Sequence, residues 1–153
     1  MSGYIPATLR RLVASRAEGH CEYCLIHEDD TFFGCQIEHI ISEKHGGPTA
    51  EENLAYACIF CNRYKGSDIA SLSPSGNLVR LYNPRTDHWS GHFQLSPDGI
   101  TILAFDEIGR VTVDLLKLNL ADRLIERQTL RAIGRYPTTT AVEKITPPSG
   151  PRL

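Results

Sequence analysis

The stretch CQIEHIISEKHGGPTAEENLAYACIFCNRYKG, residues 35–66, holds several side chains that could share one chemical task. An acid–histidine pair, Glu38-His39, is followed by two glycines, by Asn53, and by a Cys-x-x-C turn with Asn62 directly after it. Histidine can move a proton near neutral pH, and carboxylate and amide oxygens suit hard divalent cations. The order of these residues therefore favours a small metal-dependent active site.

Four cysteines form two Cys-x-x-C pairs, Cys21/Cys24 and Cys58/Cys61. Each such turn can direct two thiolates at one tetrahedral ion, and two turns complete its shell. We therefore expect a structural zinc, because four thiolates leave no open coordination position. The spacer between the pairs is longer than the roughly 15–20 residues of a zinc ribbon, which predicts a clamp closed around an inserted unit. A redox dithiol or plain buried cysteines are the alternative. Cys35 is left over and is predicted to be a small buried apolar residue.

The order EHII, GG, NLAYAC, CNRYKG resembles the HNH endonuclease family over residues 21–66. The resemblance implies a ββα-metal unit (a His-Me finger) that hydrolyses DNA phosphodiester bonds and leaves 5′-phosphate and 3′-hydroxyl ends. It implies His39 as the general base, oriented by Asn53, and Glu38 with Asn62 as ligands of a catalytic Mg²⁺ or Mn²⁺. Most members have Asp in place of Glu38, and many have His in place of Asn62.

Such an ion would stabilise the charged phosphate and the departing oxygen. Adjacent strand residues point to opposite faces, so Glu38 and His39 can serve one site only if the strand bends at its end. Taken singly, each residue also has a structural explanation. His39 could be a polar edge residue, Asn53 a turn residue, and Asn62 the cap of the next helix.

Two sets of cations could contact nucleic acid. Arg63 and Lys65 follow Asn62 and could touch phosphates beside the scissile bond, or could belong to a solvated helix face. Further along, arginines recur every fourth residue, which would align them in a ridge that could track DNA. The alternative is a solvated face partly paired with Asp122 and Glu126. The ridge consists of Arg123, Arg127, Arg131 and Arg135.

Around these residues the patterns predict an α+β fold. The first half reads as a helix over 6–18, strands over 32–41 and 54–58, and a helix over 62–71. The second half reads as a strand over 77–84, a hairpin over 93–105 with Asp98-Gly99 at its turn, and helices over 108–118 and 120–134, the last capped by Asn119. The aromatic residues between 81 and 93 are predicted to be core.

We expect one domain in three parts. Residues 1–66 form an N-terminal helix and the zinc-clamped unit, residues 67–136 an α+β extension packed on it, and residues 137–153 a flexible tail rich in Thr and Pro. With 153 residues, 41% hydrophobic and 22% charged, the composition is that of an ordinary globular protein.

The remaining features of the sequence limit which partners and which location we expect. The sequence has no apolar run near 18 residues and no signal-like N-terminus, so we expect a cytoplasmic protein without a membrane partner. A net charge of −2 argues against a protein that coats nucleic acid, and the oligomeric state is left open. DNA is the expected partner, with RNA as the alternative substrate. A non-catalytic zinc module that binds nucleic acid or a protein is the alternative function, although such a module has no need of a base.

Overall fold

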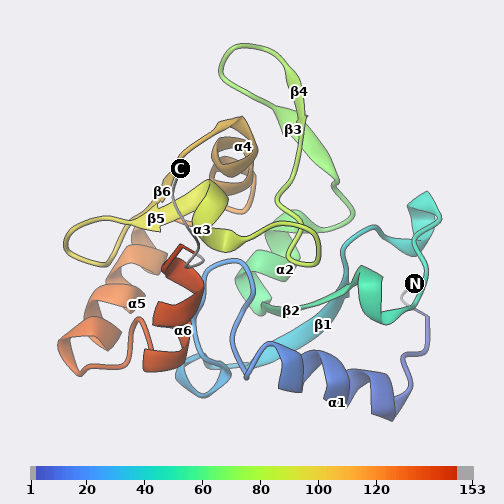
Figure 1. Cartoon of the computed structure of the whole chain (residues 1–153), viewed down its shortest axis with the longest axis horizontal. Helices are drawn as coiled ribbons and strands as arrows, with labels where there is room; N and C mark the ends of the chain where they lie inside the picture. The colour runs from blue at the N-terminus through green and yellow to red at the C-terminus, as the bar shows by residue number, and fades with distance from the viewer. Residues whose placement is uncertain (1–2, 148–153) are drawn as a thin grey trace.

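Small two-stranded antiparallel sheets with helices around them make up residues 3–147, the part of the chain that the computed structural model describes (Figure 1). The fold class is therefore α+β, as the sequence predicts. The strands are β1 (Cys35–His39), β2 (Leu54–Cys58), β3 (Ala70–Leu72), β4 (Leu78–Arg80), β5 (Phe93–Leu95) and β6 (Ile102–Ala104). The helices are α1 (Ala7–Arg16), α2 (Ile59–Lys65), α3 (Trp89–His92), α4 (Glu107–Leu115), α5 (Ala121–Ala132) and α6 (Thr139–Ile145).

The β1–β2 hairpin is the frame of the stretch that carries Glu38, His39 and Asn53, and it continues directly into α2. Its register pairs Glu38 with Ala55 and His39 with Leu54, so both members of the acid–histidine pair lie in regular strand. Helix α1 packs its apolar side on the face that carries Ile37. Because strand residues alternate, Glu38 points to the other face, where α2 lies.

Helix α2 is shorter than the sequence pattern predicts. It ends at Lys65, because Gly66 adopts a positive φ of 53° that the helix cannot continue through. The chain then enters β3, where the pattern predicts helix. The helical prediction for residues 66–71 is therefore wrong.

The second half is built from two hairpins and two longer helices. The β5–β6 hairpin turns at Asp98-Gly99 as predicted, with Gly99 at a φ of 75°. Asn119 does not cap α5, whose N-cap is Leu120 without a side-chain hydrogen bond. The Asn119 amide instead bonds both backbone groups of Ile102 in β6, at 2.9 and 2.8 Å. The cap prediction is wrong because this amide holds the hairpin.

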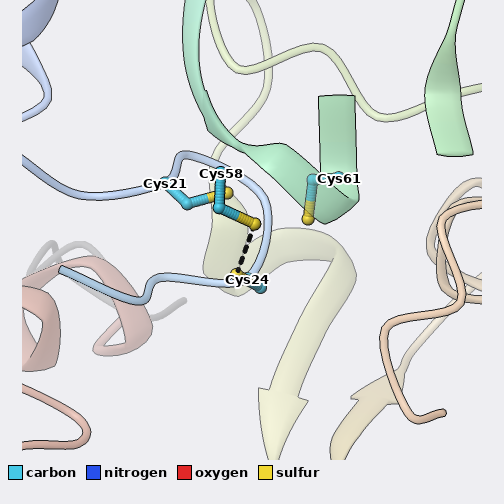
Figure 2. A group of neighbouring side chains, drawn as sticks. All are labelled: Cys21, Cys24, Cys58 and Cys61. Atoms are coloured by element: carbon cyan, nitrogen blue, oxygen red, sulfur yellow. Dashed lines mark hydrogen bonds between the residues drawn. The ribbon is translucent and has the colours of Figure 1, made fainter. Parts of the chain in front are cut away.

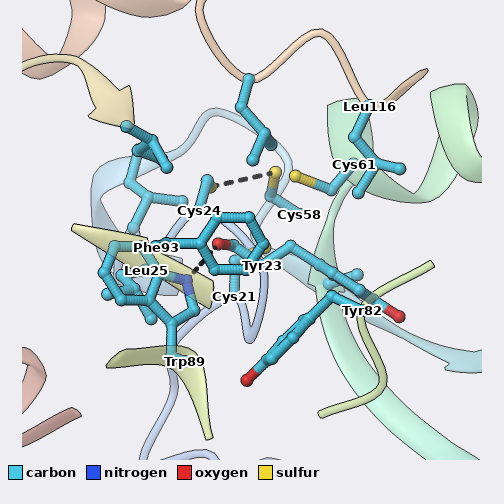
Figure 3. Packing of buried hydrophobic residues seen from close by; sticks show 14 of the residues in the cluster. Cys21, Tyr23, Cys24, Leu25, Cys58, Cys61, Tyr82, Trp89, Phe93 and Leu116 are labelled. Carbon is cyan, nitrogen blue, oxygen red and sulfur yellow. Dashed lines mark hydrogen bonds between the residues drawn. The ribbon is translucent and has the colours of Figure 1, made fainter. Parts of the chain in front are cut away.

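One hydrophobic core joins the two halves. Trp89 and Phe93 are buried beside the cysteine pairs, as expected for the aromatic stretch (Figure 3). The indole of Trp89 donates a hydrogen bond of 2.8 Å to the carbonyl of Tyr23, between the first two cysteines. Tyr136 donates to the carbonyl of Cys24 at 2.7 Å. The turn that carries the first cysteine pair is thus held by two residues from the second half of the chain.

The predicted flexible tail is wrong for its first part. Thr138 caps α6 by accepting a hydrogen bond from the amide of Ala141 at 3.0 Å, and Ala141 is fully buried. Residues 148–153, also predicted to be flexible, lie outside the described part of the chain. Among the described residues, no helix is both long enough and apolar enough to span a bilayer.

Candidate active site

The four cysteines converge from two segments: Cys21 and Cys24 from the turn after α1, Cys58 and Cys61 from the β2–α2 junction (Figure 2). All four are buried, and their sulfurs lie within 4.8 Å of one another. The sulfurs of Cys24 and Cys58 are 3.8 Å apart. A tetrahedral zinc with Zn–S bonds of about 2.3 Å separates its thiolates by about 3.8 Å. The cluster therefore fits a structural zinc, as the spacing predicts.

A cation lies against this cluster. Arg123 of α5 is 3% exposed, and its Nη2 lies 3.6 Å from the sulfur of Cys58 and 3.4 Å from that of Cys61. Burial alone would lower the pKa of Arg123, but the neighbouring thiols raise it overall. The guanidinium can thus offset part of the negative charge that four thiolates bring to the core.

Glu38 is held in a buried network between β1, α2 and the first cysteine turn. Its carboxylate accepts a hydrogen bond from the hydroxyl of Tyr23 and lies 3.2 Å from the ammonium of Lys65. Lys65 also donates to the carbonyls of His39 at 3.3 Å and Ile40 at 2.9 Å. Burial raises the pKa of Glu38 in spite of Lys65 and Tyr23, which act to lower it. The network fixes the end of β1.

His39 points to the α1 face and joins a short chain of hydrogen bonds. Its Nε2 lies 2.8 Å from the hydroxyl oxygen of Thr49, which in turn donates to a carboxylate oxygen of Glu43 at 3.2 Å. A hydroxyl has one proton to give, so when Thr49 donates it to Glu43, Thr49 accepts from the Nε2–H of His39. The other ring nitrogen, Nδ1, then carries the free lone pair, and no hydrogen bond occupies it within residues 3–147.

Asn53 does not contact the imidazole that it was expected to orient. Its amide oxygen accepts from the backbone amide of Ile41 at 3.0 Å. Its amide nitrogen donates to the carbonyls of Ile41 at 2.9 Å and Pro48 at 2.8 Å. Asn53 therefore braces the loop after β1, the loop that carries the two partners of His39. The predicted direct contact is wrong, and the residue acts one step further out.

Asn62 lies on α2 and faces β1. Its amide nitrogen donates to the side chain of Gln36 at 2.7 Å, which leaves the side-chain oxygen Oδ1 of Asn62 available. A hollow of about 410 Å³ is lined by Glu38, His39, Gln36 and Asn62 together. The predicted bend of β1 is absent, so acid and histidine stay on opposite faces. Glu38 and His39 nevertheless line the same hollow, because the hollow runs along the edge of β1 that is not paired with β2, and both faces of the strand meet at that edge.

Most of the cations expected to contact nucleic acid are buried or paired with an acidic group. Lys65 is buried in the Glu38 network, whereas Arg63 is exposed. The predicted arginine ridge is wrong, because Arg123 and Arg127 face the core and are 3% and 2% exposed. Arg127 donates to the carbonyl of Ile100 and, at 3.0 Å, to the amide oxygen of Asn119. A four-residue spacing shows that side chains share a helix face but not which face is buried.

The last two members of the ridge are exposed. Arg135 lies past the end of α5 and forms an ion pair with Asp30, with a shortest distance of 2.9 Å. Arg131 lies in the last turn of α5. The four arginines therefore have three different environments and do not form one surface.

Several residues of this region carry no signal in the sequence. Thr49 and Glu43, which hold His39, lie in a stretch that reads only as loop. Gln36 meets Asn62 because the strand and the helix happen to face each other there. Tyr23 lies between Cys21 and Cys24, and nothing in that motif indicates that its hydroxyl donates to Glu38. Only the folded chain brings these partners together.

Comparison with known proteins now gives the class. The family model described as HNH endonuclease matches residues 21–68, and this segment of the chain belongs to that family. The resemblance inferred from the motifs is thereby confirmed. Septu protein PtuB from Bacillus thuringiensis is 30% identical over 128 residues, which cover 82% of this chain and 45% of that protein. The chain thus spans about half the length of the curated relative it matches. No solved structure matches the chain.

Proposed function

We propose that the chain is a metal-dependent endonuclease that hydrolyses DNA phosphodiester bonds, with His39 as general base. The observation that carries this proposal is the hydrogen-bond chain from His39 through Thr49 to Glu43. It fixes the ring and leaves Nδ1 with a lone pair, and His39 lines the hollow that also contains Glu38 and Asn62. A base needs a fixed ring and an unoccupied nitrogen.

The oxygens of Glu38 and Asn62 are the donors for a catalytic Mg²⁺ or Mn²⁺. An ion of this kind often binds through one or two protein oxygens and completes its shell with water and substrate phosphate. Each oxygen of Glu38 has one protein partner, and a carboxylate has about four acceptor positions in all, so it can accept a further contact. When bound, the ion would stabilise negative charge on the phosphate and on the departing oxygen.

The chain's own residues then have separable tasks. His39 takes the proton from the attacking water at Nδ1, while Thr49 and Glu43 hold the ring. Asn53 keeps the loop in place, and Lys65 holds the end of β1 through the carbonyls of His39 and Ile40. A zinc module that only binds a partner would need none of this arrangement.

The proposal is tested by incubating purified protein with supercoiled plasmid, linear duplex DNA, single-stranded DNA and RNA. Each substrate is combined with Mg²⁺, Mn²⁺ or EDTA. We expect cleavage of DNA with one of the divalent ions and none with EDTA, because the structural zinc does not supply an open position. Binding without cleavage under every metal would contradict the proposal and favour the non-catalytic zinc module.

A further inference from the structure

The proposed nuclease needs cations near His39, and the surface of α1 supplies them. The chain carries a net charge of −2, so its overall field does not attract nucleic acid. Of the cations expected from the sequence to contact phosphate, Lys65, Arg123 and Arg127 are buried. Arg63 stays exposed beside Asn62, and further phosphate-binding cations can lie among other exposed residues.

Arg10 and Arg11 lie side by side in the chain and are both exposed. Within residues 3–147, no acidic group forms an ion pair with either of them. Arg10 uses only its Nε, which donates to the carbonyl of Ile5 at 3.0 Å. Both terminal nitrogens of Arg10 and the whole guanidinium of Arg11 are thus available. A guanidinium presents paired N–H groups that match two oxygens of a phosphate.

Their position follows from the way α1 packs. Leu9 and Val13 turn toward Ile37 and Leu54 of the β1–β2 hairpin. Each further residue of a helix turns by about 100°, so Arg10 emerges at the flank of the buried face and Arg11 lies close to the opposite side of the helix. Both arginines still border β1, because both line one hollow with residues of that strand.

The two arginines line a hollow of about 560 Å³ together with Gln36, Ile37 and His39. The same three residues of β1 also line the hollow of about 410 Å³ that contains Glu38 and Asn62. The two hollows therefore meet along the unpaired edge of β1. One side of this edge offers two free guanidiniums, and the other side offers the oxygens proposed to hold the catalytic ion.

We infer that Arg10 and Arg11 bind the phosphodiester backbone of the nucleic acid next to the scissile phosphate. The backbone crosses the free edge of β1. This inference rests on the proposed nuclease function and deepens it. The backbone runs from α1 past His39 toward Asn62, and the two arginines hold phosphates on one side of the cut. DNA and RNA share this chemistry, so both are tested.

Binding is measured without cleavage in a His39→Ala background, by fluorescence anisotropy with short duplex DNA, single-stranded DNA and RNA. In this background, Arg10→Gln with Arg11→Gln is compared with the unaltered arginines at salt concentrations from about 50 to 200 mM. We expect affinity for the bound nucleic acid to fall by roughly tenfold or more. The slope of log affinity against log salt should fall by roughly one to two units.

Two controls make the result specific. Arg131→Gln removes an exposed arginine of α5, a helix that lines neither hollow, and should leave affinity and slope unchanged. Arg10→Lys with Arg11→Lys keeps both charges and should restore most of the salt slope. Circular dichroism checks that each variant is folded. The single variant Arg11→Gln is a further check, because the Arg11 side chain makes no hydrogen bond within residues 3–147. This variant should keep the fold and still weaken binding.

The outcomes separate this inference from the proposed function. Binding that depends on Arg10 and Arg11 supports the inferred phosphate-binding surface even if the parent protein cleaves no substrate. Absence of cleavage would contradict only the proposed hydrolysis. Cleavage by the parent together with unchanged affinity and salt slope in the glutamine variants would overturn the surface alone. Absence of binding to every nucleic acid would also overturn it.

Discussion

The Nη2 nitrogen of Arg123 lies 3.4 Å from the sulfur of Cys61, which joins the C-terminal half of the chain to the metal-binding cluster. Four thiolates around Zn²⁺ carry a formal charge of about −2. Such charge is costly in a core unless a partner offsets it. Arg123 provides that partner from α5, more than sixty positions along the chain from the cysteine it touches.

Arg123→Ala should therefore destabilise the protein by about 3–5 kcal/mol, because it leaves buried negative charge without its partner. The measurement is urea-induced unfolding of the zinc-loaded protein. The matched control is Arg131→Ala on the same helix, which we expect to stay within about 0.5 kcal/mol of the parent. Equal stability of the two variants would show that the guanidinium does not compensate the cluster.

Removal of one zinc ligand should unfold the chain rather than merely inactivate it. Cys58→Ser breaks the tetrahedral set, and structural zinc binding is coupled to folding. Cys35→Ser is the control, since Cys35 lies opposite Cys58 in the β1–β2 register but outside the cluster. Metal analysis should find one zinc per chain in the parent and in Cys35→Ser. A well-folded, zinc-free Cys58→Ser protein would contradict this role.

The buried Lys65–Glu38 pair gives a third prediction. Lys65→Met should cost about 3–5 kcal/mol, because Glu38 then keeps a buried charge without its cation. Adding Glu38→Gln should recover part of that loss, and a double-mutant cycle measures the coupling. Strictly additive losses would show that the two groups do not stabilise each other.

A variant of Arg127 tests whether this arginine stabilises the fold or binds DNA. Arg127→Gln removes contacts to Ile100 and Asn119 that tie α5 to the β5–β6 hairpin, and should destabilise the protein by about 1–3 kcal/mol. The salt dependence of DNA binding by the folded variant should not change. A flatter salt dependence at unchanged stability would instead restore Arg127 to the nucleic-acid surface.

The features that sequence predicts well here are those with a fixed local spacing. The cysteine pairs, the β1–β2 hairpin and the Asp98-Gly99 turn each depend on a few neighbouring residues, and all three are found. Their chemistry is local: a Cys-x-x-C turn can direct two sulfurs to one point, and a glycine can adopt a positive φ.

The features that sequence misses depend on contacts between distant segments. Lys65 and Arg123 read as surface cations, because charged side chains are rarely buried without a partner. Their partners, Glu38 and the cysteine cluster, come from other elements and are known only after folding. In the same way, Asn53 was expected at the imidazole, whereas Thr49 occupies that position.

The proposed role of His39 as the base of a nuclease site can be tested by comparing two proteins. Parent and His39→Ala proteins are incubated with supercoiled plasmid and the divalent ion that supports cleavage. Zinc content and DNA affinity are measured on the same samples. We predict that His39→Ala retains its zinc and its DNA binding but loses at least about 100-fold in cleavage rate, the usual contribution of a general base. Cleavage at the parental rate by a folded, DNA-binding His39→Ala protein would contradict the account.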